Sequence, residues 1–350
     1  MLKNPYQFIG PLAPEKDKTI CIVREKERNK VIAGISSGEY WTIVGPSQVG
    51  KTTFMFQLMH ELPVFHTLYI NFGISPKEDE PFYKWIIQRI IDTIPSDSSP
   101  ELAEKWQTFG PELNFFNFLC EFKPRENKKI VFFFDDMEKA HCVRSFLHLW
   151  RKVFHERYTQ PDLGRYMVVT AGKVDLHALT IGITSPFNIA QKLELGNFTE
   201  IELGKLVEGP INQYKIEFES AAKHKLISQT AGHPQLLQHL CYILFEETAG
   251  KTKLITGKEI DGAIDRLLIE NDNLKTLEKE VKTNEVLESL LRQILKGESK
   301  DFTFYRDLSL TGTGPIIPED GYCRIRNKIY EKIIKNVEFW GILYYIITLA

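Results

Sequence analysis

Hydrophobic and polar positions follow two different patterns in the first part of the chain. Up to about residue 200, short apolar runs alternate with longer stretches in which apolar residues recur every three or four positions. Short runs rich in β-branched and aromatic residues predict strands, and the longer pattern predicts helices. The expected strands are residues 19–23, 40–44, 67–72, 130–134 and 166–170, and the expected helices are residues 52–62, 81–94 and 143–157. This alternation predicts an α/β fold, a parallel sheet with helices on both faces.

The strand pattern stops near residue 198, and helical periodicity replaces it. The expected helices are residues 198–207, 217–229, 233–247 and 284–295. In the third of these, leucines spaced by about four residues form one apolar stripe, and Pro234 falls in the first turn, where a missing N–H costs nothing. After the turn Asp320-Gly321, residues 322–325 alternate like a strand and residues 327–335 like a helix. This order suggests a small winged-helix unit.

Composition places few limits on function. The chain has 350 residues, enough for two or three compact units, and 44 basic against 46 acidic side chains give a net charge of −2. This balance predicts no overall attraction to nucleic acid or anionic membranes. Five scattered cysteines without a C-x-x-C pair indicate buried thiols in a reducing compartment and no zinc site. With no signal-peptide pattern and no apolar run of about 18–20 residues, we expect a cytoplasmic protein without a membrane span.

Residues 45–53 read Gly-Pro-Ser-Gln-Val-Gly-Lys-Thr-Thr and match G-x-x-x-x-G-K-[ST] completely. Gly45 and Gly50 let the backbone turn its N–H groups toward phosphate oxygens, and the following helix adds its positive end. Lys51 brings a charge to the β- and γ-phosphates, and the Thr52 hydroxyl suits Mg²⁺. The flanking strand and helix are the context that this motif requires. The predicted nucleotide-binding residues are Gly45, Pro46, Ser47, Gln48, Val49, Gly50, Lys51, Thr52 and Thr53.

A second acidic site follows the buried strand at residues 130–134. Asp135 would lie at the carboxyl end of a central strand, where ligands bind, and would hold Mg²⁺ opposite Thr52. Asp136 is placed to orient and deprotonate the attacking water, so Lys51 and Asp136 are the candidate catalytic residues. A plain helix N-cap is the alternative for this acidic pair. Many related ATPases carry Glu at the second position, and the shorter Asp136 predicts slow turnover.

The sequence favours adenine over guanine nucleotides. Gly172-Lys173-Val174-Asp175 approaches the guanine-recognition pattern Asn/Thr-Lys-x-Asp but lacks its first residue. Thr170, at the expected tip of the preceding strand, is either a γ-phosphate sensor or an ordinary turn hydroxyl. ATP or ADP with Mg²⁺ is therefore the expected ligand.

With these motifs assembled, the chain resembles the AAA-like, STAND-type P-loop ATPases of signalling and regulatory proteins. The resemblance also rests on Asn4-Pro5-Tyr6 with Gly10-Pro11-Leu12, on residues 22–27, 185–189 and 193–199, on Thr230-Ala231-Gly232-His233-Pro234, and on residues 322–330. It implies a P-loop core at residues 1–198, a helical lid at 199–275, a winged helix at 276–340 and an apolar tail at 341–350. That tail is either a packed terminal element or a link to a further module or partner.

The resemblance implies a switch in which ADP is held at rest and exchange for ATP promotes assembly. Arg24 and Pro234 would flank the base or ribose, although Val23 stands where the family usually has Gly. Each residue has a plainer interpretation as a helix start. None of Arg144, Arg151, Arg157 and Arg165 is singled out as an arginine finger.

Three functions remain as hypotheses. The first is a regulatory ATPase acting through nucleotide-dependent contacts with a protein partner or with other copies of itself. The second is a DNA-associated ATPase whose winged helix presents a basic face, for which a solvated helix face is the alternative explanation. That face would comprise Arg324, Arg326, Lys328, Lys332 and Lys335. The third is a scaffold that binds nucleotide without hydrolysing it.

Overall fold

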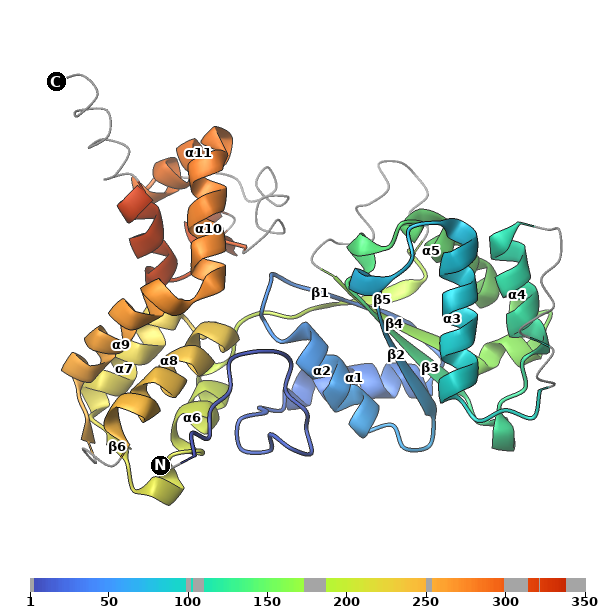
Figure 1. Cartoon of the computed structure of the whole chain (residues 1–350), viewed down its shortest axis with the longest axis horizontal. Coiled ribbons are helices and arrows are strands. Elements are labelled where there is room, and N and C mark those ends of the chain that lie inside the picture. Colours follow the sequence, from blue (N-terminus) through green and yellow to red (C-terminus); the bar gives the residue numbers. More distant parts are fainter. Residues whose placement is uncertain are drawn as a thin grey trace. The chain divides into compact units, whose positions relative to one another are not determined.

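A computed structural model describes residues 3–98, 102, 110–172, 187–249, 254–298, 314–320 and 322–337. The chain divides into two compact units (Figure 1). The first unit comprises Val23–Gly45 and Lys51–Leu195. The second comprises Met1–Ile22, the short segment Pro46–Gly50, and Gly196–Ala350. The N-terminal segment is thus grouped with the C-terminal half of the sequence rather than with the strands that follow it.

The first unit contains a five-stranded parallel sheet in the order β2-β3-β4-β1-β5. Its strands are β1 (Tyr40–Val44), β2 (His66–Asn71), β3 (Ile130–Asp135), β4 (Tyr166–Gly172) and β5 (Ala190–Glu194). Every residue of β1, β3 and β4 is buried, whereas the edge strands β2 and β5 are only partly buried. Burial on both faces explains the continuous apolar runs of the three central strands.

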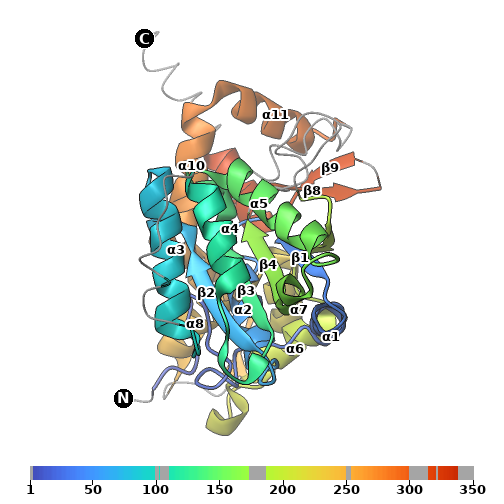
Figure 2. The same cartoon turned by 90° about the vertical axis from the view of Figure 1, so that its right-hand side faces the viewer.

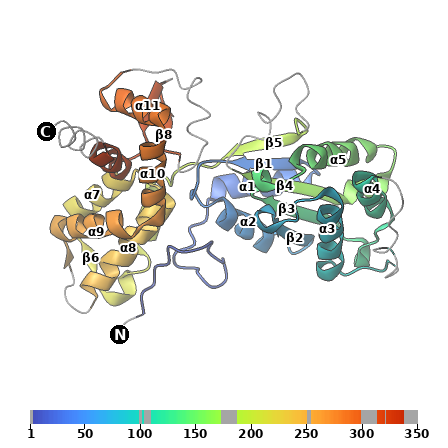
Figure 3. The ribbon, with the colours of Figure 1, turned by 45° about the horizontal axis from the view of Figure 1, so that its top comes forward.

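Helices cover both faces of this sheet. One face carries α3 (Asp79–Thr93), α4 (Pro111–Glu121) and α5 (Val143–Glu156), seen in front of the strands in Figure 2. The opposite face carries α1 (Glu25–Ser36) and α2 (Lys51–His60), which lie across the strands from α3, α4 and α5 in Figure 3. The first face is packed with aromatic rings: Phe134 and Phe146 have centroids 5.1 Å apart, and Phe132 and Trp150 have centroids 5.2 Å apart. Such pairs contribute about 0.5–1.5 kcal/mol beyond their buried area.

The second unit is mainly helical. Its helices are α6 (Glu200–Glu208), α7 (Ser220–Thr230), α8 (Pro234–Thr248), α9 (Gly257–Glu270), α10 (Asp272–Thr283) and α11 (Glu285–Leu295). A parallel pair joins β6 (Glu217–Phe218) to β7 (Leu254–Ile255), and an antiparallel hairpin joins β8 (Ile316–Glu319) to β9 (Tyr322–Ile325). Residues 328–337 are helical. The buried apolar residues of all these parts form one core.

The N-terminal segment packs on the helices of this second unit. Tyr6 is buried, and its hydroxyl donates a hydrogen bond to the Val207 carbonyl 2.8 Å away. The Gln238 side chain donates to the Ile20 carbonyl at 3.1 Å. These contacts attach the start of the chain to α6 and α8.

Gly232 shows why the turn before α8 needs glycine. Its φ is +76°, a conformation that side chains disfavour, and an added Cβ would meet the Phe198 carbonyl oxygen at 2.6 Å. The Phe198 N–H also donates to the Gly232 carbonyl at 2.9 Å. The glycine therefore allows two backbone segments to approach closely just before the helix that Pro234 begins.

The structure confirms the α/β class and most predicted elements. The strand at residues 40–44 is found with the predicted bounds, and the predictions at 67–72, 130–134 and 166–170 differ from β2, β3 and β4 by one or two residues. The strand predicted at residues 19–23 is wrong, because residues 18–20 form a turn and residues 21–23 have no regular structure. The Ile20 and Cys21 N–H groups bond to the Asp17 carbonyl instead of to a neighbouring strand. The pattern also missed β5, and strands do continue after residue 198, as β6 to β9.

The structure tests only some of the predictions for the C-terminal part of the chain. Residues 328–337 confirm a helix close to the predicted 327–335, and β9 has the predicted bounds. The winged-helix assignment and the domain boundaries stay predictions. The apolar tail at residues 341–350 lies outside the described residues. Among the helices that are described, none combines the length and apolar character needed to cross a bilayer.

Candidate functional site

The loop between β1 and α2 contains two residues with a left-handed backbone. Gln48 and Gly50 have positive φ angles of 62° and 90°. Glycine adopts such angles without the steric cost that a Cβ brings, which explains the residue type at position 50. Because α2 begins at Lys51, the N–H groups of its first turn and the positive end of its dipole lie at the end of the loop. This arrangement suits an anion with several oxygens.

The Lys51 side chain folds back over the same loop. Its ammonium donates a hydrogen bond to the Gly45 carbonyl oxygen, 2.7 Å away. Val49 is fully buried and fixes the middle of the loop, whereas Ser47 and Gln48 are partly exposed. The ammonium is therefore held at the loop by a contact that a phosphate oxygen could replace.

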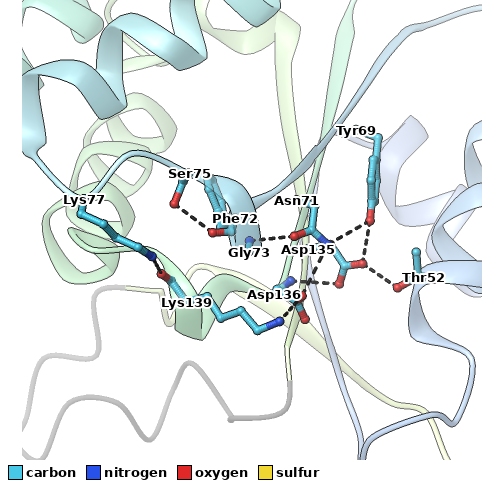
Figure 4. Close-up of polar contacts among 10 residues, drawn as sticks. All are labelled: Thr52, Tyr69, Asn71, Phe72, Gly73, Ser75, Lys77, Asp135, Asp136 and Lys139. Atoms are coloured by element: carbon cyan, nitrogen blue, oxygen red, sulfur yellow. Dashed lines mark hydrogen bonds and ion pairs between the residues drawn. The ribbon is translucent and has the colours of Figure 1, made fainter. Parts of the chain in front are cut away.

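Asp135 brings the two halves of the predicted site together. The residue is 3% exposed, and its Oδ2 accepts a hydrogen bond from the Thr52 hydroxyl at 2.6 Å (Figure 4). The same oxygen accepts a second hydrogen bond, from the Tyr69 hydroxyl at 2.9 Å. Its other oxygen, Oδ1, accepts from the Asp136 N–H at 3.0 Å. The predicted partners Thr52 and Asp135 thus meet, although 83 residues separate them in the sequence.

Tyr69 was not predicted from the sequence. Its ring packs edge-on against Phe56 of α2, with centroids 5.0 Å apart. Burial raises the pKa of the Tyr69 phenol, and the neighbouring Asp135 carboxylate raises it further. The phenol therefore keeps its proton and acts as a donor to Asp135. β2 thus contributes to the acidic site as well as β3.

Asp136 lies just beyond β3 with a left-handed backbone (φ 54°, ψ 42°). Its Oδ2 accepts a hydrogen bond from the Lys139 ammonium at 2.7 Å and a longer one from the Asn71 side-chain amide at 3.4 Å (Figure 4). Asn71 in turn accepts from the Gly73 N–H at 2.7 Å. The hydrogen bond to Asp136 raises the pKa of the Lys139 ammonium. Asp136 occupies the N-cap position of the short 3₁₀ helix Met137–Lys139, but its side chain makes no capping hydrogen bond.

The donor set fits Mg²⁺. The described residues contain no cluster of three His, Cys, Asp or Glu side chains that would hold a metal unaided. Mg²⁺ usually takes only one or two protein oxygens and completes its shell with water and substrate phosphates. The adjacent Thr52 hydroxyl and Asp135 carboxylate, next to a phosphate-type loop, match that requirement.

The two residues predicted to flank the base belong to different units. Arg24 is buried and is the N-cap residue of α1 in the first unit. Pro234 is buried and is the first residue of α8 in the second unit. Their role toward a nucleotide stays a prediction.

The expectation for Thr170 needs correction. β4 continues to Gly172, so Thr170 does not lie at the strand tip. It is fully buried, and its hydroxyl donates to the Thr42 hydroxyl of β1 at 2.9 Å. The hydroxyl therefore joins two neighbouring strands inside the sheet. Of the guanine-type near-match, residues 173–175 lie outside the described residues.

The predicted basic face is smaller than expected. Arg326 is only 1% exposed, and its Nε donates to the Asn197 side chain at 3.1 Å. Arg324 is partly buried, whereas Lys328, Lys332 and Lys335 are exposed. Two of the five proposed side chains are thus wholly or partly withdrawn from solvent, because the hairpin packs into the core of the second unit.

The comparisons with known proteins agree with this geometry. A family model described as an AAA-like domain matches residues 13–336. Solved structures with a similar fold include the Walker-type ATPase PABY2304 of Pyrococcus abyssi, with 14% identity, a TM-score of 0.66, and 93% of this chain and 99% of that chain covered. The RuvB Holliday junction branch migration motor of Thermotoga maritima has 16% identity and a TM-score of 0.51, with 93% of this chain and 98% of that chain covered. Cdc6p of Pyrobaculum aerophilum has 12% identity and a TM-score of 0.52, with 90% of this chain and 93% of that chain covered. At these identities the likeness shows a shared fold. Comparison with curated proteins gives no match.

Proposed function

The chain belongs to the AAA-like domain family, and we propose that it binds ATP with Mg²⁺ at residues 45–53 and hydrolyses it slowly as a regulatory switch. The observation that carries this proposal is the 2.6 Å hydrogen bond between the Thr52 hydroxyl and the Asp135 carboxylate. A fold alone does not imply a function. Here the hydroxyl of the loop and the carboxylate of β3 supply the two oxygens that a metal–nucleotide site needs.

Each residue of the site has a distinct task in this proposal. The backbone N–H groups of the loop and the first turn of α2 bind the phosphates, and Lys51 exchanges its contact with Gly45 for a contact with phosphate. Asp136 orients the attacking water and accepts its proton. Mg²⁺, when bound by Thr52 and Asp135, would neutralise charge on the phosphate oxygens.

The switch belongs to the STAND-type interpretation of the sequence. In it, ADP is held at rest with Arg24 and Pro234 beside the base or ribose, and ATP promotes contacts with a protein partner or with further copies of this chain. The short side chain of Asp136 and its contact with Lys139 support slow hydrolysis, since the carboxylate is already engaged. Slow hydrolysis leaves each nucleotide state long-lived, as a switch requires.

The purified protein tests this proposal directly. We expect ADP to co-purify with it, and we expect phosphate release from ATP of well under one per second that stops when EDTA removes Mg²⁺. Chromatography of the denatured protein identifies the nucleotide, and a phosphate-release assay gives the rate. Protein that neither carries nor binds nucleotide would remove the basis of the proposal. Turnover of many per second without a partner would contradict the switch.

Replacing Tyr69 with phenylalanine tests the support around Asp135. A hydrogen bond to a charged group is worth about 1.5–3 kcal/mol, and Asp135 keeps its contact with Thr52. We therefore expect the Mg²⁺ concentration for half-maximal phosphate release to rise about three- to ten-fold, with little change in the rate at saturating Mg²⁺. Tyr158→Phe is the matched control because Tyr158 is 75% exposed. An unchanged Mg²⁺ dependence in Tyr69→Phe would show that the phenol does not position Asp135.

The DNA-associated alternative has weaker support. It relied on five basic residues, of which Arg326 is buried and bonded to Asn197. The three exposed lysines remain available, and a phosphate-dominated complex would weaken steeply between low and moderate salt. The proposal therefore rests on protein contacts as the output of the switch.

A further inference from the structure

Lys139 is attached to Asp136 at two points. The Lys139 N–H donates to the Asp136 carbonyl at 2.9 Å, which closes a tight turn, and the Lys139 ammonium donates to Asp136 Oδ2 at 2.7 Å. The turn itself is steadied from outside, because the Lys77 ammonium donates to the Lys139 carbonyl at 3.4 Å (Figure 4). The backbone thus aims the ammonium back at the carboxylate three residues earlier.

This contact occupies the residue expected to activate water. Asp136 Oδ2 already accepts from Lys139 and, at longer range, from the Asn71 amide. The ammonium competes for the oxygen that a water molecule would need. The Lys139 side chain is 50% exposed, so the pair can open without disturbing the core.

We propose that Lys139 is a positioning residue that restrains Asp136 in a resting state and so limits the rate of hydrolysis. The inference rests on the proposed function, because it assigns a second residue to the same catalytic step. Release of Lys139 by a partner or by a rearrangement of the turn would free Asp136 for water. The restraint is a local electrostatic one. It adds a second cause of slow turnover to the short side chain of Asp136.

The test compares Lys139→Met with two controls. Methionine keeps the length and apolar stem of the side chain but removes the charge, whereas Lys139→Arg keeps the charge. Lys84→Met removes an equal charge from an ion pair of similar exposure, which Lys84 makes with Glu80 on α3. Phosphate release is measured at saturating ATP and Mg²⁺, together with the KM for ATP and the melting temperature.

We expect Lys139→Met to raise the maximal rate about two- to five-fold, the range that a partly exposed ion pair can supply. The KM for ATP and the melting temperature should change little, and Lys84→Met should keep the parent rate. Because salt screens exposed charges, the parent rate should rise with ionic strength while the Lys139→Met rate stays nearly constant. A purely structural role for Lys139 would not give this difference in salt dependence.

Combination with Asp136→Asn separates the possible failures. The increase caused by Lys139→Met should vanish in the double variant, because no carboxylate remains to be released. If Asp136→Asn lowers the parent rate but Lys139→Met leaves it unchanged or reduces it, the restraint is refuted and the proposed function stands. A reduced rate would assign Lys139 to stabilising the reacting phosphate instead. If Asp136→Asn has no effect on the parent, the proposed catalytic role of Asp136 fails, and the restraint fails with it.

Discussion

Replacing Lys51 with alanine is expected to weaken ATP binding about ten- to a hundred-fold and to remove measurable phosphate release. Hydrogen bonds to charged groups contribute about 1.5–3 kcal/mol, and each 1.4 kcal/mol is a factor of ten in affinity. Hydrolysis should suffer more than binding, because the charge on the phosphate oxygens grows in the transition state. Titration with a fluorescent ATP analogue gives the affinity, and the phosphate-release assay gives the rate.

The fold should tolerate this substitution. Lys51 is partly exposed, and its ammonium donates to the Gly45 carbonyl of the loop. We therefore expect the melting temperature without nucleotide to stay close to that of the parent, while the stabilisation by ATP disappears. Lys84→Ala removes a charge that is half exposed and paired with Glu80 on α3, and it should bind ATP normally. Equal affinity in Lys51→Ala and the parent would rule out the loop as the phosphate site.

The sequence predicted those parts of the fold in which local pattern and burial agree. β1, β3 and β4 are buried along their whole length, and burial on both faces of the sheet explains their continuous apolar runs. The phosphate-type loop was predictable because its spacing is fixed by backbone geometry, and the positive φ of Gly50 agrees with that reasoning. Asp135 was found because a carboxylate directly after a buried strand lies at the end of the sheet.

The errors lie where tertiary contacts decide the structure. β5 has the sequence Ala-Gln-Lys-Leu-Glu, and only Ala190 and Leu193 are buried, so this edge strand looks polar. Residues 19–23 look like a strand because Ile20 and Cys21 are apolar, but Ile20 is buried in the core of the second unit instead. A short apolar run does not reveal which surface it covers.

The predicted site was incomplete for a similar reason, because tertiary contacts bring further residues to it. Tyr69 and Asn71 reach the acidic residues because β2 pairs with β3 in a register that sets Asn71 opposite Asp135. Register depends on the whole sheet and is not readable from β2 alone. Lys139 could have been noticed three residues after Asp136, but its contact depends on the left-handed backbone of Asp136, which sequence spacing does not show.

Replacing Asp136 with asparagine is expected to lower phosphate release by about a hundred- to ten-thousand-fold while ATP binding is retained. This is the range that a positioned general base contributes, and an amide cannot accept the proton from water. Binding should persist because the Lys51 contact and the Thr52–Asp135 pair do not involve the Asp136 carboxylate. The measurement combines single-turnover phosphate release with the affinity for ATP in the presence of Mg²⁺.

Asp135→Asn provides the contrast that makes this result specific. Asp135 accepts from both Thr52 and Tyr69, so its loss should weaken Mg²⁺-dependent nucleotide binding as well as the rate. Asp136→Asn should instead separate the two, with normal affinity and a low rate, because Asp136 acts only on the water. If Asp136→Asn hydrolysed ATP within a few-fold of the parent, another group would be the base. If the parent and the variant both bound ATP but neither released phosphate, the chain would be a scaffold that binds nucleotide without hydrolysing it.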